Sequence, residues 1–397
     1  MKMIADLQIH SRFSRATSSA ITIPNLEKYA RLKGLNLLGT GDFTHPKWLA
    51  ELKDELIEDG SGILASKSGF NFVLQGEISN IYTQDGKSRR IHSLLLARNF
   101  EVVEQISKAL LKKGRLDYDG RPIFGFSCIE LVEMMKEIDN DIEVIPAHAW
   151  TPWYGIFGSM SGFDSVEECF KDQAKHIHAI ETGLSSDPSM NWRISKLDKY
   201  TLLSSSDAHS FWPWRLGREA NVFDIELSYD ALLGAIRKKK GFVETIEMWP
   251  HEGKYHYTGH RSCNVCLSPK ESLKLKNICP KCKKPLTVGV AQRVELLADR
   301  PEGFVPKNAV PFRNIISLSE VIAGTVGEKV ESKKTWNEYY SLTNNFGNEF
   351  EVILNADEKE LKKITTEKIA NNIIKNRSQK ISFKPGYDGV YGIPIFD

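Results

Sequence analysis

Six apolar, strand-like runs of this chain are each followed directly by a side chain that can bind a metal ion. They are Ile9-His10, Gly41-Asp42, Gly76-Glu77, Ile91-His92, Ala147-His148 and Ser206-Asp207-Ala208-His209. A barrel-like sheet brings ligands from distant parts of a sequence together when they lie at the ends of its strands. A single histidine of this kind is more often a satisfied core residue. Six such sites in the same context instead indicate a metal centre.

Residues 1–248 alternate strand-like and helix-like runs, which is typical of an α/β domain. We predict a strand over residues 4–10 and a helix that begins after Thr22 and ends before Gly34. Residues 70–97 form a β-rich segment, in which Asp85-Gly86 predicts a hairpin turn. Further helices are predicted at residues 102–111, 129–138 and 229–240.

The length and composition of the chain describe a globular protein with more than one domain. Its 397 residues exceed a typical single domain, and 41% of them are hydrophobic and 26% charged. The N-terminus lacks the apolar segment of a signal peptide, and no apolar run approaches a membrane span. We therefore predict a cytoplasmic protein with no membrane association.

Four of the six cysteines form two Cys-x-x-Cys pairs that are twelve residues apart: Cys263 with Cys266, and Cys279 with Cys282. This spacing in a short polar segment indicates a zinc ribbon with four thiolate ligands. Such a site is structural, because four thiolates leave no open position for a substrate. A redox pair is the alternative. Cys128 and Cys169 stand alone and are expected to be buried in helices.

Positive charge is concentrated in the segment that carries the cysteine pairs. Residues 251–290 have a net charge of +6, whereas the whole chain has +2. A basic module of this kind favours a polyanionic substrate such as nucleic acid. The run Arg237–Lys240 is interpreted as a solvated helix end and not as a nucleic-acid contact.

The predicted ligands favour metal-assisted hydrolysis. Histidine and carboxylate side chains bind Zn²⁺, Mn²⁺ or Fe²⁺, and a carboxylate such as Glu77 can bridge two ions. Metal pairs of this kind assist the hydrolysis of phosphoesters. Neither a phosphate-binding Gly-x-x-x-x-Gly-Lys-Ser/Thr loop nor a Gly-x-Ser-x-Gly elbow occurs in the sequence. P-loop nucleotide hydrolysis and serine hydrolase chemistry are therefore unsupported.

Five of the stretches resemble the successive motifs of PHP (polymerase and histidinol phosphatase) domains: Asp6–Ser11, Gly39–Pro46, Gly76-Glu77, Ala147-His148 and Ser206–His209. The resemblance implies a distorted β/α barrel with two or three divalent ions (Zn²⁺, Mn²⁺ or Mg²⁺) at a phosphoesterase centre. The ligand candidates that it implies are Gln8, His10, Asp42, His45, Glu77, His92, His148, Asp207 and His209. Two of these positions depart from the family pattern. Gln8 replaces the first histidine of a His-x-His motif, and Phe43 follows Asp42 where the family has histidine, with His45 two residues further on.

The order of barrel, ribbon and helical tail resembles the endonuclease Q family. Matching stretches are Pro146–Trp153, Leu286–Val290, Arg293–Arg300 and Lys384–Gly389. The resemblance implies an enzyme that flips out a deaminated base (uracil, hypoxanthine or xanthine) or an abasic site and cuts DNA on the 5′ side of the lesion. It divides the chain into a PHP-type phosphoesterase domain (1–248), a zinc ribbon (249–289) and a mainly helical region that grips DNA (290–397).

This hypothesis gives roles to particular residues. Asp207, His209 and His148 are predicted to be catalytic. Trp150, Trp153 and Tyr154 are predicted to contact a flipped base, and Arg12 and Lys281 to contact phosphates. For the aromatic residues the alternative is core packing, and for Arg12 an ordinary surface charge. The protein is expected to act as a monomer on DNA, with replication or repair proteins as further partners.

Two other functions are compatible with parts of the sequence. One is a PHP-family phosphatase that acts on a small phosphomonoester, although such an enzyme has little use for a basic ribbon. The other is a DNA-binding protein whose metal site has decayed, an idea that Gln8 supports. The presence of Glu77, His148, Asp207 and His209 argues against decay.

Overall fold

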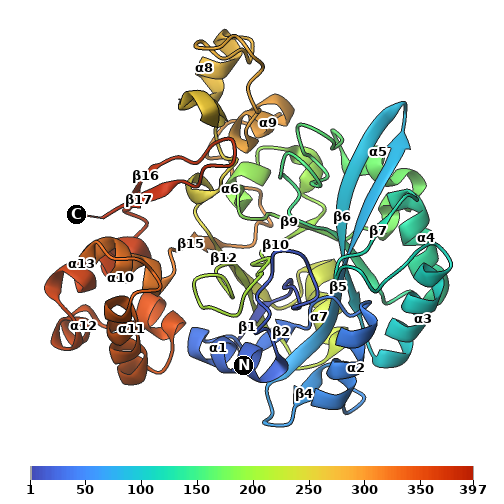
Figure 1. The fold of residues 1–397 in the computed structure, drawn as a ribbon, viewed down its shortest axis with the longest axis horizontal. Coiled ribbons are helices and arrows are strands. Elements are labelled where there is room, and N and C mark those ends of the chain that lie inside the picture. Colours follow the sequence, from blue (N-terminus) through green and yellow to red (C-terminus); the bar gives the residue numbers. More distant parts are fainter. Residues whose placement is uncertain (1, 397) are drawn as a thin grey trace.

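A mixed α/β fold is built on one eleven-stranded sheet in the computed structural model, which describes residues 2–396 (Figure 1). The sheet has the order β15-β12-β11-β1-β2-β5-β4-β3, and β6 and β7 also pair with β5, while β8 pairs with β6. Its strands are β1 (Lys2–Asp6), β2 (Leu37–Gly39), β3 (Leu56–Glu58), β4 (Leu64–Ser66), β5 (Asn71–Gln84), β6 (Lys87–Ala97), β7 (Ile123–Phe124), β8 (Glu143–Pro146), β11 (Ala220–Asp224), β12 (Phe242–Glu247) and β15 (Phe312–Asn314). The α/β class predicted from the sequence is confirmed.

Helices connect many of these strands, and polar caps set where several of them begin. They are α1 (Ile23–Lys33), α2 (Pro46–Glu55), α3 (Phe100–Leu111), α4 (Cys128–Ile138), α5 (Val166–Phe170), α6 (Pro188–Asn191) and α7 (Tyr229–Lys238). At the start of α1 the Thr22 side chain accepts a hydrogen bond from the amide of Asn25, and Gly34 ends the helix with φ 101°. The predicted bounds of this helix are therefore confirmed.

A long β-hairpin differs from its predicted form and decides where two metal-ligand candidates lie. Asp85 and Gly86, with φ of 51° and 72°, form the predicted turn between β5 and β6. However, β5 runs without interruption from Asn71 to Gln84, so Glu77 and His92 lie inside strands and not at strand ends. The neighbouring strand β2 pairs with β5 only as far as Val73. Glu77 therefore lies beyond the end of its neighbouring strand.

A separate parallel pair, β9 (Ala179–Glu181) and β10 (Thr201–Leu203), connects the two flanks of the sheet. After β8, the amide of Ala149 donates to the carbonyl of Glu181 at 3.0 Å. After β10, the hydroxyl of Ser204 donates to the carbonyl of Ile246 in β12 at 2.7 Å. These hydrogen bonds join the sheet and the pair into a barrel-like arrangement.

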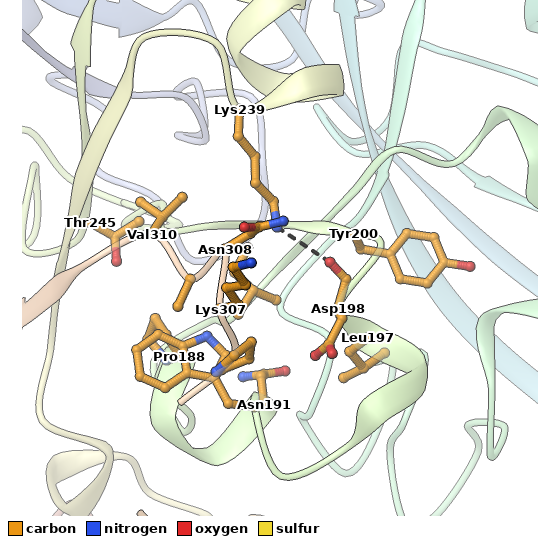
Figure 2. A pocket seen from close by; sticks show the side chains of 14 residues that line it. Pro188, Asn191, Leu197, Asp198, Tyr200, Lys239, Thr245, Lys307, Asn308 and Val310 are labelled. Atoms are coloured by element: carbon orange, nitrogen blue, oxygen red, sulfur yellow. Dashed lines mark hydrogen bonds between the residues drawn. The ribbon is translucent and has the colours of Figure 1, made fainter. Parts of the chain in front are cut away.

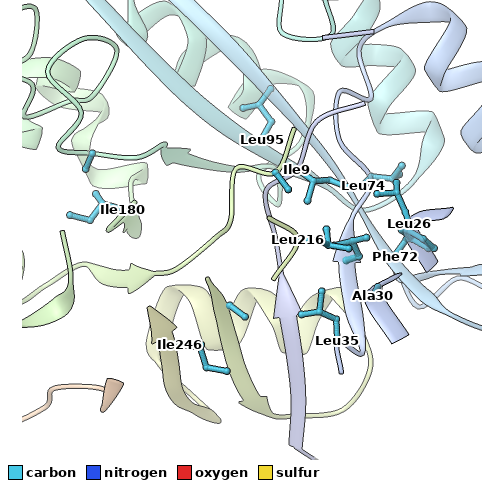
Figure 3. Close-up of a cluster of buried hydrophobic side chains, with 14 of the residues drawn as sticks. Ile9, Leu26, Ala30, Leu35, Phe72, Leu74, Leu95, Ile180, Leu216 and Ile246 are labelled. Atoms are coloured by element: carbon cyan, nitrogen blue, oxygen red, sulfur yellow. The ribbon is translucent and has the colours of Figure 1, made fainter. Parts of the chain in front are cut away.

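Aliphatic side chains fill the space between the sheet and its helices (Figure 3). Leu26 and Ala30 of α1 lie in the same cluster as Phe72 and Leu74 of β5, and all four are essentially inaccessible to solvent. Full burial of one large aliphatic or aromatic side chain stabilises a fold by roughly 1.5–3 kcal/mol. This packing holds the strands, and the loops that leave them, in fixed positions.

The ribbon and the helical region lie at two different corners of the barrel domain (Figure 1). The ribbon contains β13 (Thr258–His260), β14 (Val265–Leu267) and α8 (Pro269–Lys274), followed by α9 (Val290–Leu297). The C-terminal region contains α10 (Leu318–Val326), α11 (Lys333–Phe346), a π-helical turn at Glu351–Asn355, α12 (Glu358–Ile364), α13 (Glu367–Arg377), β16 (Ser382–Lys384) and β17 (Ile393–Ile395). It is mainly helical, as predicted. Within residues 2–396 no helix is long and apolar enough to cross a membrane.

A buried ion pair fastens the helical region to the barrel domain. Lys33, the last residue of α1, is inaccessible to solvent, and its ammonium lies 2.7 Å from Oε1 of Glu349. It also donates to the carbonyl of Pro213 and to the hydroxyl of Ser317. The second Glu349 oxygen accepts the Tyr339 hydroxyl at 2.8 Å. Both charges are thus fully hydrogen-bonded, which a buried pair requires.

Lys33→Met should lower the free energy of unfolding by about 3–5 kcal/mol, because the Glu349 carboxylate would remain buried without its partner. Urea denaturation of the variant and the wild type measures the difference. The control is Arg31→Met in the same helix, whose half-exposed ion pair with Glu27 should contribute less than ~1 kcal/mol. Equal losses from the two variants would contradict the role given to the buried pair.

Candidate metal centre and its cavity

Six of the predicted ligands gather into two adjacent groups. One group is His10, Asp207 and His209, and the other is Glu77, His92 and His148. Within each group the candidate ligand atoms lie within 4.8 Å of one another. The first group comes from the loops after β1 and β10, and the second from β5, β6 and the loop after β8. Residues up to 199 positions apart in the sequence therefore converge on one place.

Glu77 joins the two groups. Its Oε2 lies 3.0 Å from Nε2 of His10, and its Oε1 lies 2.7 Å from Nδ1 of His92 and 3.4 Å from Nε2 of His148. Burial by itself would raise the pKa of the Glu77 carboxyl, but the positive charge of Arg121 and the neighbouring histidines hold that pKa well below its usual value. Glu77 therefore stays ionised, and an ionised carboxylate in this position can bridge two metal ions.

The backbone is strained at three residues of the centre. Asp42, His148 and Asp207 have φ of 41°, 32° and 48°, in the left-handed region that non-glycine residues rarely adopt. Such conformations cost roughly 1–3 kcal/mol each and persist only where the surrounding structure enforces them. Their clustering here is independent support for a functional site.

Asp42 lies outside both ligand groups, so direct metal binding by this residue stays a prediction. Its Oδ1 is 2.9 Å from Nδ1 of His10, and its Oδ2 accepts hydrogen bonds from the Ser11 amide, the Ser11 hydroxyl and the Ser14 hydroxyl. These four contacts hold the carboxylate in place behind His10. A carboxylate behind a ligating histidine fixes the tautomer and orientation of the ring, here with Nε2 directed at Glu77 and Asp207.

Gln8 and His45 also lie outside the two groups. The amide of Gln8 donates to Oε2 of Glu77 at 3.2 Å, so this residue contacts a ligand, and its own Oε1 is buried without a partner. The ring of His45 stacks on Phe13 at 4.3 Å and precedes α2. The prediction that His45 reaches the cluster is therefore not supported by the geometry.

Arg121 also belongs to the centre, although no sequence motif predicts this role. Its Nη1 lies 3.4 Å from both oxygens of Glu77. It stands in the turn before β7, directly after Gly120, where a Cβ atom would lie 2.3 Å from Oδ2 of Asp42. A lone arginine in a turn carries no motif. The close approach that requires glycine at position 120 is visible only in three dimensions.

A cavity of about 840 Å³ opens beside the metal centre. This volume is in the range of pockets that enclose most of a drug-sized ligand. Four of the candidate ligands line it: His92, His148, Asp207 and His209. The rest of its wall includes small and polar residues together with four cations and four aromatic rings, namely Arg121, Arg215, Arg218 and Lys254 with Trp153, Tyr154, Tyr255 and Tyr391. The centre therefore faces a site suited to an anion that carries flat rings.

The predicted substrate contacts divide into two sets. Trp153 and Tyr154 line the cavity, as expected. Trp150 is only 1% exposed, packs on Phe157, and donates its indole hydrogen to Asn191, so for this residue the core alternative holds. Arg12 forms a two-point ion pair with Glu51, which places its guanidinium away from the cavity lining.

The ribbon also gathers a set of candidate metal ligands, three of which belong to the predicted four-cysteine set. His260, Cys263, Cys279 and Cys282 have candidate ligand atoms within 4.8 Å of one another. Cys266 is not in this group, and its sulfur lies 3.9 Å from the carbonyl of Pro385. Thiolate and imidazole donors suit tetrahedral Zn²⁺. Lys281 is exposed nearby, with its ammonium bonded to the carbonyl of Cys263.

A second cavity, of about 180 Å³, lies near the start of β10, whereas the metal centre follows its end (Figure 2). Lys239 and Tyr200 line it, and the Lys239 ammonium donates to the carbonyl of Asp198 at 3.3 Å. None of the candidate ligand groups found among residues 2–396 lies in this cavity.

Comparison with solved structures identifies the family. A lesion-specific endonuclease from Pyrococcus furiosus superposes with a TM-score of 0.89 and 31% identity, over 100% of this chain and 96% of that one. An endonuclease Q bound to a 27-mer duplex with an abasic lesion at its active site superposes with a TM-score of 0.90. It is 31% identical in sequence, and the match covers 100% of this chain and 97% of that one. This chain belongs to the endonuclease Q family.

Curated relatives of this family member carry no assigned function. The uncharacterized protein YqxK of Bacillus subtilis is 29% identical and is matched over 98% of both chains. The uncharacterized protein MJ0043 of Methanocaldococcus jannaschii is 35% identical over 64% of this chain. The matched region spans only 33% of the length of MJ0043. Residues 317–380 match the family model for the MJ0043 C-terminal domain. The helical region is thus a recognisable unit in its own right.

Asp42→Asn should weaken metal binding or activity about 10–100-fold, as is typical when the partner behind a ligating histidine is lost. Metal titration of the purified protein measures the affinity. His45→Gln is the matched control and should retain the metal, because the ring of His45 packs on Phe13 and lies outside both groups. A loss of metal in His45→Gln as large as that in Asp42→Asn would return His45 to the ligand set.

His260→Ala should release the ribbon ion, whereas Cys266→Ser should retain it, because only His260 lies in the ligand group. Zinc content per chain and the Tm of each variant are the measurements, with Cys279→Ser as the reference for complete loss. The opposite result, with zinc retained in His260→Ala and lost in Cys266→Ser, would restore the four-cysteine set.

Proposed function

We propose that this chain is a metal-dependent DNA repair endonuclease that cuts beside damaged nucleotides. The observation that carries the proposal is the whole-chain similarity to two endonuclease Q structures, one of them bound to a duplex with an abasic lesion. The substrates proposed are deaminated bases (uracil, hypoxanthine and xanthine) and abasic sites, with the cut on the 5′ side of the lesion. The metal centre and the cation-rich cavity beside it fit this chemistry.

The two ligand groups would hold two divalent ions, with Glu77 between them. Their donors, which are imidazole nitrogens and carboxylate oxygens, suit Zn²⁺ or Mn²⁺. Ions bound there would supply Lewis acidity towards a phosphodiester. Asp207, His209 and His148 are proposed as the catalytic residues. All three, like His92, belong to the ligand groups and also line the cavity.

The residues around the centre bind and orient the DNA. The guanidinium of Arg121 lies beside Glu77 on the cavity wall, where it can pair with a phosphate oxygen that approaches the centre. Arg215 and Lys254 line the same cavity. A phosphodiester next to the ligands would therefore meet positive charge from several directions, which favours one orientation of the backbone.

The cavity provides room for a nucleotide that has left the duplex. At about 840 Å³ it can accept a flipped base beside the ligands, with Trp153 and Tyr154 on its wall. Enzymes that act on a base inside a duplex must remove it from the stack, and a damaged or missing base costs less to remove. This cost difference favours lesions over intact sequence.

The ribbon and the helical region are proposed to grip the duplex on either side of the lesion. The ribbon exposes Lys270, Lys274, Lys276, Lys281, Lys283 and Lys284. Contacts between lysines and phosphates add affinity that does not depend on sequence and weakens as salt rises. We retain the division into a phosphoesterase domain (1–248), a ribbon (249–289) and a DNA-gripping region (290–397). A cytoplasmic location agrees with six unpaired cysteines.

A phosphatase for a small phosphomonoester is the competing function. The composition of the cavity favours the nuclease, because Lys254 and Tyr255 come from the ribbon and Tyr391 comes from the C-terminal tail. A small substrate would not need walls contributed by three distant parts of the chain. The salt dependence separates the two functions, since only a polyanionic substrate releases many counterions on binding.

A nicking assay tests the proposal. The substrates are end-labelled duplexes that contain uracil, hypoxanthine, an abasic site or no lesion, each with and without a chelator. We expect metal-dependent nicks 5′ to each lesion. Asp207→Ala should lose nicking activity by more than the ~10–100-fold that is typical of residues that only support a ligand. Asp54→Ala changes an exposed residue of α2 and should cut like the wild type. Equal cutting of undamaged DNA, or no metal-dependent cutting, would reject the repair function.

A further inference from the structure

The C-terminal tail contributes one aromatic ring to the cavity of the metal centre. Tyr391 is separated from the last ligand, His209, by 182 positions in the sequence, yet both line the same cavity. Tyr391 is 48% exposed, although it lines the cavity. A ring that is held in place but left open on one side is available to a flat ligand.

The tail is fastened to the ribbon. The amides of Gly386, Gly389 and Gly392 donate to the carbonyls of His251, Lys254 and Glu252 at 2.8, 2.8 and 3.0 Å. The Asp388 carboxylate accepts the amide of Arg261 and the hydroxyl of Thr287, both at 2.7 Å. Five hydrogen bonds thus fix residues 386–392 against residues 251–261 and against Thr287.

Glycine is required at two positions of this contact. A Cβ atom on Gly386 would lie 2.4 Å from the carbonyl oxygen of Gly253, and one on Gly392 would lie 1.9 Å from that of His251. No side chain fits at either distance. Because Gly392 directly follows Tyr391, the same close approach fixes the backbone that carries the ring.

Two cations accompany the ring. The Lys254 ammonium lies 5.4 Å and the Arg215 guanidinium carbon 5.8 Å from its centroid. Lys254 is exposed to solvent, and Arg215 is partly exposed. Long cationic side chains can move to a phosphate, whereas the ring is held by the tail. The arrangement thus combines a stacking surface with two neighbouring cations that can pair with phosphate.

We propose that Tyr391 stacks on the base of the flipped lesion nucleotide, while Lys254 and Arg215 pair with the phosphates next to it. This inference rests on the proposed function and makes the C-terminal tail part of lesion recognition. The geometry favours a nucleotide because the ring shares a cavity with the metal ligands and the cations. Stacking requires a base, so the effect of Tyr391 depends on the kind of lesion.

The experiment compares two duplexes that differ only at the lesion, one with uracil and one with an abasic site. Loss of stacking is worth a factor of roughly 5–100 per base. We expect Tyr391→Ala to lower kcat/KM for uracil by a factor in this range and to lower the ratio of uracil to abasic cutting with it. Tyr391→Phe should restore that ratio. The control is Tyr340→Ala, a similarly exposed tyrosine of α11 outside the cavity.

The ratio of the two rates does not depend on the fraction of active enzyme, so a partly misfolded variant still gives an answer. Lys254→Gln and Arg215→Gln should instead slow the cutting of both duplexes alike. Each should also reduce the slope of log affinity against log salt concentration by about 1. An unchanged ratio in Tyr391→Ala would overturn the stacking role even though the wild type repairs both lesions. A wild type that cuts neither duplex would overturn the proposed function itself.

Discussion

A full negative charge buried inside a β-hairpin organises the catalytic half of this molecule. Glu77 is inaccessible to solvent, and an isolated carboxylate in such a place would be protonated. His10, His92, His148 and Arg121 surround it and keep it ionised. Each of these residues lies on a different loop or strand. Several parts of the barrel must therefore pack around the Glu77 carboxylate to compensate its charge.

The same constraint explains which features could be predicted from the sequence. The sequence predicts the types of ligand and their approximate places, because an apolar run followed by histidine or a carboxylate is a pattern of neighbouring residues. The position of Glu77 within β5 is not determined by neighbouring residues in the sequence. It depends on β5 continuing past Val73, where its neighbour β2 stops. The role of Asp42 was equally hidden, because spacing does not reveal which nitrogen of His10 an oxygen will contact.

The sequence also does not predict which aromatic residues of one loop face the cavity. Trp150 and Trp153 are three residues apart in one loop, yet the first lies in the core and the second lines the cavity. In a loop with no regular period, the sequence does not specify which side faces inward. Arg121 and Tyr391 had no motif at all. Both enter the site through glycine-dependent close approaches, at Gly120 and Gly392, which only tertiary structure creates.

The buried pair of Lys33 and Glu349 has a consequence for how this family can diversify. The helical region is recognisable by itself, since residues 317–380 match a separate domain model. However, Glu349 lies within it, whereas Lys33 lies in the first helix of the barrel domain. A barrel paired with helices that lack this carboxylate would bury the Lys33 ammonium without a partner charge. The two positions are therefore expected to change together during evolution, and exchange of the helical region is restricted to partners that supply a matching carboxylate.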